Sequence, residues 1–274
     1  LAYAQERRQG RAVGAKADES DAIIVHPDVK LMLMQMRSLT AAARSICYAT
    51  AVAIDISQRA HDPKVRDAAT ARAALLTPLA KAFSTDIGNE VASLGVQIHG
   101  GMGFIEETGA AQHFRDARIT AIYEGTNGIQ SIDLVTRKLA AQGGASVFAL
   151  LDELSQIVQR VETSNNPAFG HTGGRLREAL GSLERTSKWL LETLPSKPND
   201  ALAGATPYLR LFSTTLGGCM LADEALSLAQ ENGAAARITL ARFFAENVTV
   251  QAGALERTVI DGADAVNAAD SVLL

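Results

Sequence analysis

The stretch that decides the fold is Lys64–Ile98, KVRDAATARAALLTPLAKAFSTDIGNEVASLGVQI. Its apolar residues recur every three or four positions, which is the spacing of one face of an α-helix. We therefore predict a single long helix. Pro78 lies inside the pattern, and because proline lacks a backbone donor and crowds the preceding turn, we expect a kink or a local break there. The predicted buried face consists of Ala73, Leu76, Leu79, Phe83, Ile87, Val91, Leu94 and Ile98.

Helical patterns continue on both sides of this stretch. His26-Pro27-Asp28 opens another long helix, and Asp62-Pro63 forms the turn between the two. We also predict the end of a helix at 1–9, a loop at 10–21, and helices at 108–115, 126–141, 147–163, 175–194, 199–232 and 234–252. Apolar residues make up 47% of the chain and aromatic residues only 5%. This composition suits packed helices and not a β-sandwich, so the predicted fold class is all-α.

The best candidate for a domain boundary is Ala140–Ser146, AAQGGAS, where the composition changes. We predict two consecutive helical bundles, residues 1–142 and 143–274. The last stretch, 261–274, is weakly patterned and is expected to fray.

Charge and composition exclude several classes of function. The net charge is −4 and no basic stripe is present, which argues against nucleic-acid binding. We find no segment apolar enough to span a bilayer, and the histidines are too scattered for a metal site. The two cysteines, Cys47 and Cys219, are interpreted as buried free thiols. The chain lacks a starting Met and opens in mid-helix, so we expect a fragment of something longer.

Three stretches contain residues that suit chemistry. In QIHGGMGF, Gln97–Phe104, the paired glycines Gly100 and Gly101 suit a helix C-cap, but they also let backbone N–H groups approach an anion. In YAQERRQGR, Tyr3–Arg11, the arginines are either a solvated helix end or a phosphate contact.

The third stretch is AIYEGTNGIQ, Ala121–Gln130, which places Glu124 in a sharp connector. An acid close to a helix start is favoured by the helix dipole, and this would be a purely structural role. A carboxylate enclosed in an apolar pocket instead has a raised pKa and becomes a usable base near neutral pH.

Together these stretches are recognisable. ERRQGR, KAFSTDIGNEVASLGVQIHGGMGF and FRDARITAIYEGTNGIQ, in this order and spacing, strongly resemble the C-terminal helical domain of flavin-dependent acyl-CoA dehydrogenases over residues 1–141. Residues 143–274 resemble, in layout, the extra C-terminal domain of a bacterial subgroup that includes 3-methylmercaptopropionyl-CoA dehydrogenase-like members. The resemblance implies a cytoplasmic bacterial flavoprotein of fatty acid metabolism.

The resemblance implies a role for particular residues. Glu124 matches the base that removes the α-proton of an acyl-CoA while the β-hydrogen leaves as hydride to FAD. Tyr123 and Gly125 match the substrate pocket. The positions that match FAD contacts are Arg7, Gln97, Gly100, Gly101 and Thr126.

The resemblance also implies a homo-oligomer, a dimer or tetramer, and an electron-transfer flavoprotein as partner. Because the family's N-terminal and middle domains are absent, we expect this chain alone to be inactive. Three alternatives stay open: an acyl-CoA oxidase, a non-catalytic helical assembly module, and an enzyme whose base lies on an upstream helix. The role of residues 143–274 and the acyl chain length are not indicated by the sequence.

Overall fold

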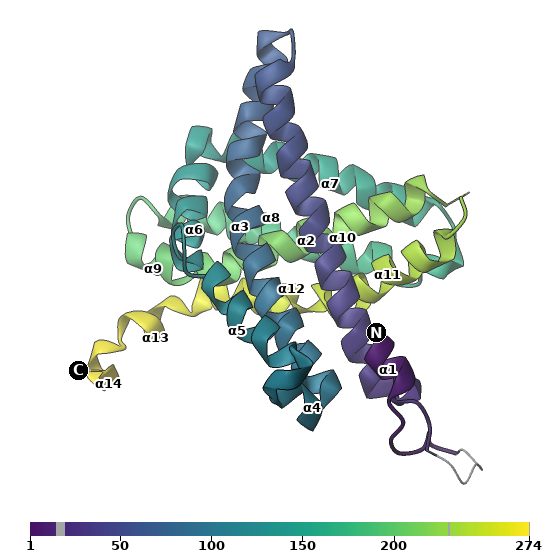
Figure 1. Ribbon diagram of the computed structural model, residues 1–274. Helices are drawn as coiled ribbons and strands as arrows, with labels where there is room; N and C mark the ends of the chain where they lie inside the picture. Colours follow the sequence, from purple (N-terminus) through teal and green to yellow (C-terminus); the bar gives the residue numbers. More distant parts are fainter. Residues whose placement is uncertain (15–19, 230, 274) are drawn as a thin grey trace.

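The computed structural model describes residues 1–14, 20–229 and 231–273. The loop predicted at 10–21 therefore falls partly outside the described residues, at 15–19. Two long antiparallel helices, α2 (Pro27–Arg59) and α3 (Pro63–His99), form the hairpin that dominates Figure 1. Asp62 caps α3, since its carboxylate accepts a hydrogen bond of 2.9 Å from the backbone N–H of Lys64.

The predicted long helix is confirmed, and its middle is the best-buried part. Leu76, Leu79, Phe83 and Ile87 are all buried, whereas Val91 and Leu94 are only half-buried. The helix α3 runs through Pro78 without interruption, so the alternative of a local break is wrong. Pro78 is buried, and the packing of neighbouring helices on α3 holds the helix together where one backbone hydrogen bond is missing.

The shorter elements of the first half differ from the sequence-based bounds. They are α1 (Ala2–Glu6), α4 (Gly101–Phe104), α5 (Ala110–Thr120) and α6 (Asn127–Asp133). The helix predicted at 108–115 starts later and is longer, and α4 was not predicted. The helix predicted at 126–141 changes to a π-helical turn at Leu134–Leu139, where Leu134, Val135 and Leu139 are buried. Packing of these side chains, which local patterns do not encode, sets the path of the backbone.

The second half contains eight α-helices in the described part of the chain. They are α7 (Ala145–Thr163), α8 (Thr172–Thr193), α9 (Pro198–Ala203), α10 (Ala205–Ser227), α11 (Ala234–Asn247), α12 (Ala252–Asp261), α13 (Ala263–Asn267) and α14 (Asp270–Leu273). The helix predicted at 199–232 is wrong, because it divides at Gly204. A Cβ on Gly204 would lie 2.9 Å from Cγ1 of Val259 on α12. The helix predicted at 234–252 likewise ends early, at Asn247.

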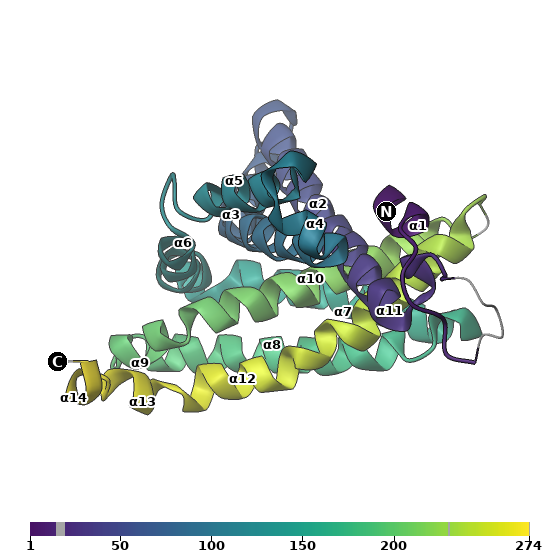
Figure 2. The same cartoon turned by 60° about the horizontal axis from the view of Figure 1, so that its bottom comes forward.

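The helix α10 lies at the centre of the molecule. It packs against α7, α8, α11 and α12 of its own half and also against α2, α3 and α6. Figure 2 shows α8, α10 and α12 running side by side beneath the layer formed by α2, α3 and α5. One hydrophobic core therefore runs across the predicted boundary, which itself lies in a turn where Gln142 and Gly143 have left-handed backbone angles. The division at 142/143 stays a prediction.

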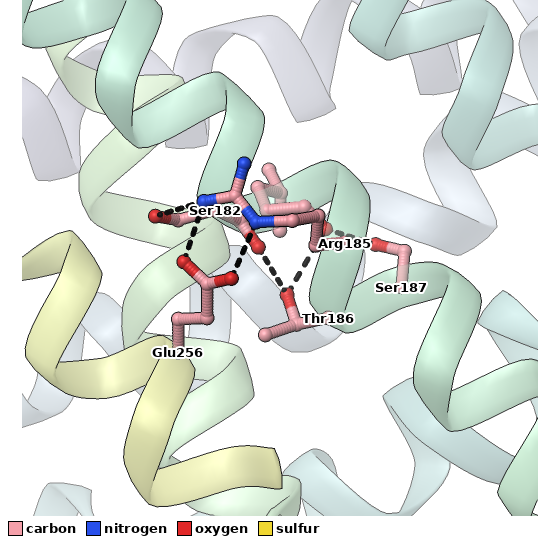
Figure 3. A network of polar contacts seen from close by, with 6 residues as sticks. Ser182, Arg185, Thr186, Ser187 and Glu256 are labelled. Atoms are coloured by element: carbon pink, nitrogen blue, oxygen red, sulfur yellow. Dashed lines mark hydrogen bonds and ion pairs between the residues drawn. The ribbon is translucent and has the colours of Figure 1, made fainter.

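A polar network on α8 joins this helix to α12 (Figure 3). The guanidinium of Arg185 donates two hydrogen bonds, of 2.5 and 2.7 Å, to the carboxylate of Glu256. On the other side of α8, the hydroxyls of Ser187 and Tyr208 lie 2.8 Å apart in the core. These contacts fix the rotation of α8 between its neighbours.

The all-α fold class is confirmed, since the described ranges contain helices and no strand beyond an isolated bridge between Arg8 and Ala22. One expectation from sequence is wrong: α2 is long and apolar enough, by length and composition alone, to cross a membrane. Core helices meet the same criterion, and α2 packs along α3 and against α10. Leu39 and Ile46 of α2 are buried in those contacts.

Candidate functional site

The connector between α5 and α6 contains Glu124, and Figure 2 shows it as a loop between these helices. Its backbone turns sharply because Glu124 and Gly125 both have left-handed φ angles, 54° and 86°. The turn is closed by a hydrogen bond of 3.1 Å from the N–H of Asn127 to the carbonyl of Ala121. Thr126 then caps α6, its hydroxyl oxygen accepting from the N–H of Ile129. A left-handed glutamate is uncommon and marks a backbone that its surroundings hold in place.

Glu124 is exposed. The neighbouring Tyr123 is 50% exposed. Within the described residues, neither the N–H nor the carboxylate of Glu124 has a hydrogen-bond partner. The apolar pocket that we expect around this acid is thus not formed by the described part of this chain, and both polar groups of Glu124 are available to something else.

The connector is attached to α3 by polar side chains that the sequence analysis missed. The ammonium of Lys81 donates hydrogen bonds of 2.8 Å to the carbonyl of Gly125 and 2.8 Å to Oδ1 of Asn127. The amide nitrogen of Asn127 in turn lies 2.6 Å from Oδ1 of Asp86. Lys81 and Thr85 stand four positions apart and so lie on one face of α3, where both contact Asn127. That spacing within KAFSTD is the only signal that sequence offered.

A second group of predicted site residues lies at the C-terminal end of α3. Gly100 ends the helix with φ 59° and ψ −140°, a conformation open to glycine. A Cβ on Gly101 would meet open space, whereas a Cβ on Gly103 would lie 2.3 Å from the carbonyl oxygen of Val96. Gly103 is therefore required for the fold, while Gly101 faces outward, as does the exposed side chain of Gln97.

The N-terminal segment packs onto this end of α3. The ring of Tyr3 stacks on His99 with centroids 4.3 Å apart, and the Tyr3 hydroxyl donates to the carbonyl of His99 at 3.2 Å. Arg7 follows directly after α1 and is exposed. Its guanidinium makes an exposed contact of 3.3 Å with Gln9. The structure thus brings the segment that contains Arg7 to the end of α3 that contains Gln97, Gly100 and Gly101.

The two groups of predicted site residues are far apart within one chain. Lys81, which contacts the connector, precedes Gly100 by 19 residues of α3, which corresponds to about 28 Å at 1.5 Å per residue. The structure therefore does not bring Glu124 and Thr126 together with Arg7 and the glycines in one small pocket. A ligand that contacts both groups must be long, or must span two copies of the chain.

Other candidate chemistry lies outside these groups. Both cysteines are free, as predicted. Cys47 is exposed, contrary to our expectation of burial. Cys219 is buried, and burial raises the pKa of its thiol to about 12. Among the described residues no cluster of three His, Cys, Asp or Glu side chains could hold a metal. A groove of 510 Å³ lies between α7 and α8, lined by Phe148, Leu151 and Leu180 among others. None of the predicted site residues lines it.

Comparison with protein families matches the chain twice. Residues 1–140 match the acyl-CoA dehydrogenase C-terminal domain, and residues 150–270 match the acetyl-CoA dehydrogenase C-terminal-like domain. The 3-methylmercaptopropionyl-CoA dehydrogenase of Ruegeria pomeroyi is 39% identical over 97% of this chain. The chain spans 46% of that relative's length.

Two solved structures share the fold. An acyl-CoA dehydrogenase from Bacillus anthracis, complexed with FAD, superposes with a TM-score of 0.73 over 98% of this chain and 47% of its own, at 18% identity. ACDH-11 of Caenorhabditis elegans, in complex with C11-CoA, gives a TM-score of 0.72 over 94% of this chain and 43% of its own, at 19% identity. These two structures share the fold, and the family match over residues 1–140 shows that the chain belongs to the acyl-CoA dehydrogenase family.

Proposed function

We propose that this chain acts as the C-terminal part of a flavin-dependent acyl-CoA dehydrogenase, which converts an acyl-CoA thioester to the trans-2-enoyl-CoA. The observation that carries the proposal is the conformation of Glu124 inside the matched region. Its acid is held on a turn with a left-handed backbone, exposed, and without a partner in the described part of the chain. Strained positions of this kind cluster at functional sites.

Glu124 is the proposed base for the α-proton. A carboxylate oxygen takes the proton from the carbon next to the thioester carbonyl, and the free N–H of the same residue donates to the thioester oxygen as negative charge develops there. Both groups belong to one residue of a short, exposed turn, so a single substrate can meet them together. An α-proton is too weakly acidic for a hydrated carboxylate, so the carboxylate must lose its water before it reacts.

The residues at the end of α3 suit the anionic part of FAD. The carbonyl end of a helix repels an anion, so a cation is needed there, and the guanidinium of Arg7 supplies it. Its one side-chain contact among the described residues, with Gln9, is exposed. Gly101 leaves open space where a side chain would stand. We propose that Arg7 meets the pyrophosphate and that Gln97, Gly100 and Gly101 contact the adenosine part. Bound FAD would supply the acceptor for the β-hydrogen, which leaves as hydride.

Thr126 and the neighbouring apolar side chains complete the proposed site. The Thr126 oxygen accepts the N–H that caps α6, so its O–H remains free to donate to FAD. Tyr123 and Gly125 flank the base on the substrate side. Exposed apolar residues lie on the connector and on the two helices that flank it, namely Phe114, Ile119, Ile122, Ile129 and Ile132. Such a surface suits coverage by acyl-CoA and by another part of an assembled enzyme.

The separation of the two groups supports a homo-oligomer, dimer or tetramer, in which the end of α3 contacts the FAD of a neighbouring subunit. Electron-transfer flavoprotein is the proposed electron acceptor. We also propose that the 274 residues alone are inactive, since Glu124 is exposed to water in them.

The test is Glu124→Gln in the full-length protein that contains this chain, with Glu178→Gln, an exposed acid on α8, as the matched control. We expect enoyl-CoA formation to fall at least about 1000-fold in the first variant, since the base is removed, and to stay unchanged in the second. Flavin content should be equal in both. Full activity of Glu124→Gln would contradict the proposal and favour a base on another helix or a non-catalytic role for this region. Peroxide formation in air would favour an oxidase.

A further inference from the structure

Lys81 contacts the residues on both sides of Glu124. Its ammonium donates 2.8 Å hydrogen bonds to the carbonyl of Gly125 and to Oδ1 of Asn127. It also lies 5.9 Å from the ring centroid of Tyr123, within the range of a cation–π contact. The half-buried ammonium of Lys81 on α3 therefore lies against residues that precede Glu124 in the chain and residues that follow it.

The orientation of the Asn127 amide follows from the chemistry of its neighbours. An ammonium can only donate and a carboxylate can only accept, so the Asn127 oxygen must face Lys81 and its nitrogen must face Asp86. The same nitrogen lies 3.2 Å from the carbonyl of Ala82 and 2.9 Å from the hydroxyl of Thr85. Reversing the amide would set two donors against each other at Lys81 and two acceptors against each other at Asp86.

These contacts explain how a glutamate keeps a left-handed backbone. An L-residue other than glycine resists this conformation and persists in it only where the surroundings fix it from several sides. Lys81 fixes the carbonyl of the next residue, and Asn127 ties the following helix start to α3. Without them, the connector would relax toward ordinary backbone angles.

We propose that Lys81, acting through Gly125 and Asn127, is the positioning residue that holds the carboxylate and N–H of Glu124 in their working orientation. The inference rests on the proposed role of Glu124. Lys81 does not touch the reacting atoms in this arrangement; it fixes the backbone on which the base stands. Asp86 acts one step further away, by fixing the amide of Asn127.

The first test is Lys81→Met in the full-length protein, with Lys64→Met at the N-terminal end of α3 as a control that removes the same charge from an exposed site. Amide hydrogen exchange should become at least about 10-fold faster in peptides covering 121–127 for Lys81→Met only, as contacts that close this loop are lost. The rate kcat per bound flavin should fall about 10- to 100-fold, because a displacement near 1 Å has that effect, while KM changes little. Unchanged exchange, or unchanged kcat, in Lys81→Met would overturn the proposal.

A second test exchanges the polar groups of one pair. Asn127→Asp places two carboxylates side by side at Asp86 and should reproduce the loss of kcat and the faster exchange. Adding Asp86→Asn lets the new amide donate to the new acid, so the double variant should recover most of both quantities. Absence of recovery would count against the proposal even if the Lys81 variant unfolds. The Glu124→Gln variant distinguishes the role of Glu124 as base from the role of Lys81 as positioning residue. Full activity of Glu124→Gln refutes the proposed base. An inactive Glu124→Gln together with a fully active Lys81→Met refutes only the role of Lys81.

Discussion

The crossing of α2 and α10 joins the two halves of the chain and depends on Gly217. A Cβ built on Gly217 would lie 2.8 Å from Cβ of Ala42 on α2 and 3.7 Å from Cζ of Phe244. Carbon atoms prefer separations of about 3.5–4.0 Å, so the first contact is too short by about 0.7–1.2 Å. The Ala42 methyl is fixed to its backbone and cannot rotate away. Gly217→Ala must therefore push the two helices apart.

The magnitude follows from two opposing effects. Overpacking of a rigid core contact destabilises by about 1–3 kcal/mol, and the fixed methyl places this site near 3. Replacing glycine by alanine inside a helix stabilises by about 1 kcal/mol. The expected net loss for Gly217→Ala is about 2 kcal/mol. Gly88→Ala on α3 is the matched control, because its Cβ would meet nothing within 4 Å and it should gain about 1 kcal/mol.

A reciprocal exchange sharpens the test. Ala42→Gly should destabilise by about 2 kcal/mol, from lost helix propensity and one lost buried methyl. In the double variant Ala42→Gly/Gly217→Ala, the methyl group is moved from α2 to α10 and none is added. We therefore expect a free energy of unfolding within about 1 kcal/mol of that of the starting protein, whereas additive effects would lower it by about 4 kcal/mol. Urea unfolding followed by circular dichroism measures all four variants. Stabilisation by Gly217→Ala equal to that of Gly88→Ala would refute the close approach of α2 and α10.

Three further predictions concern pH, a buried hydroxyl and the strained turn. The hydrogen bond from Arg185 lowers the pKa of Glu256 below its ordinary value of 4.5. The stability that this pair contributes is therefore present above pH 4.5 and is lost as the pH falls through the pKa of the folded state. The urea midpoint should drop in acid, and it should drop less steeply in Glu256→Gln. Tyr208→Phe removes the 2.8 Å contact with the hydroxyl of Ser187 and should lower the free energy of unfolding by about 1 kcal/mol, which thermal unfolding measures. Glu124→Gly should raise the free energy of unfolding by about 0.5–1 kcal/mol, because glycine accepts the left-handed angles without strain. Enoyl-CoA formation by the full-length protein should be lost in the same variant. A lower free energy of unfolding would contradict the idea that the backbone of Glu124 is strained.

The elements that sequence predicted well are those whose burial follows one period over many residues. The helices α2 and α3 are 33 and 37 residues long, and caps such as Asp62-Pro63 mark their limits. The helix breaks that were missed depend on distant partners. Gly204 divides a predicted helix because α12 lies against it, and no local pattern announces that contact. Local sequence thus predicts where helices occur, and tertiary packing decides where they end.

The candidate site divides in the same way. Its glycines and its acid stand out because they lie in connectors between helices, and the resemblance to acyl-CoA dehydrogenases draws attention to Glu124 and Gly100. Lys81 and Asp86 look like ordinary solvated positions on α3, and only the contact with Asn127, more than forty residues later, gives them a role. In the described chain, contacts with α3 fix the backbone on both sides of Glu124, and Glu124 itself is exposed to solvent. Rigid support without enclosure orients a base but does not dry it, and a hydrated carboxylate cannot remove a carbon-bound proton at a useful rate. The proposed chemistry therefore requires a second surface over the connector, and the exposed isoleucines around it mark where that surface would lie.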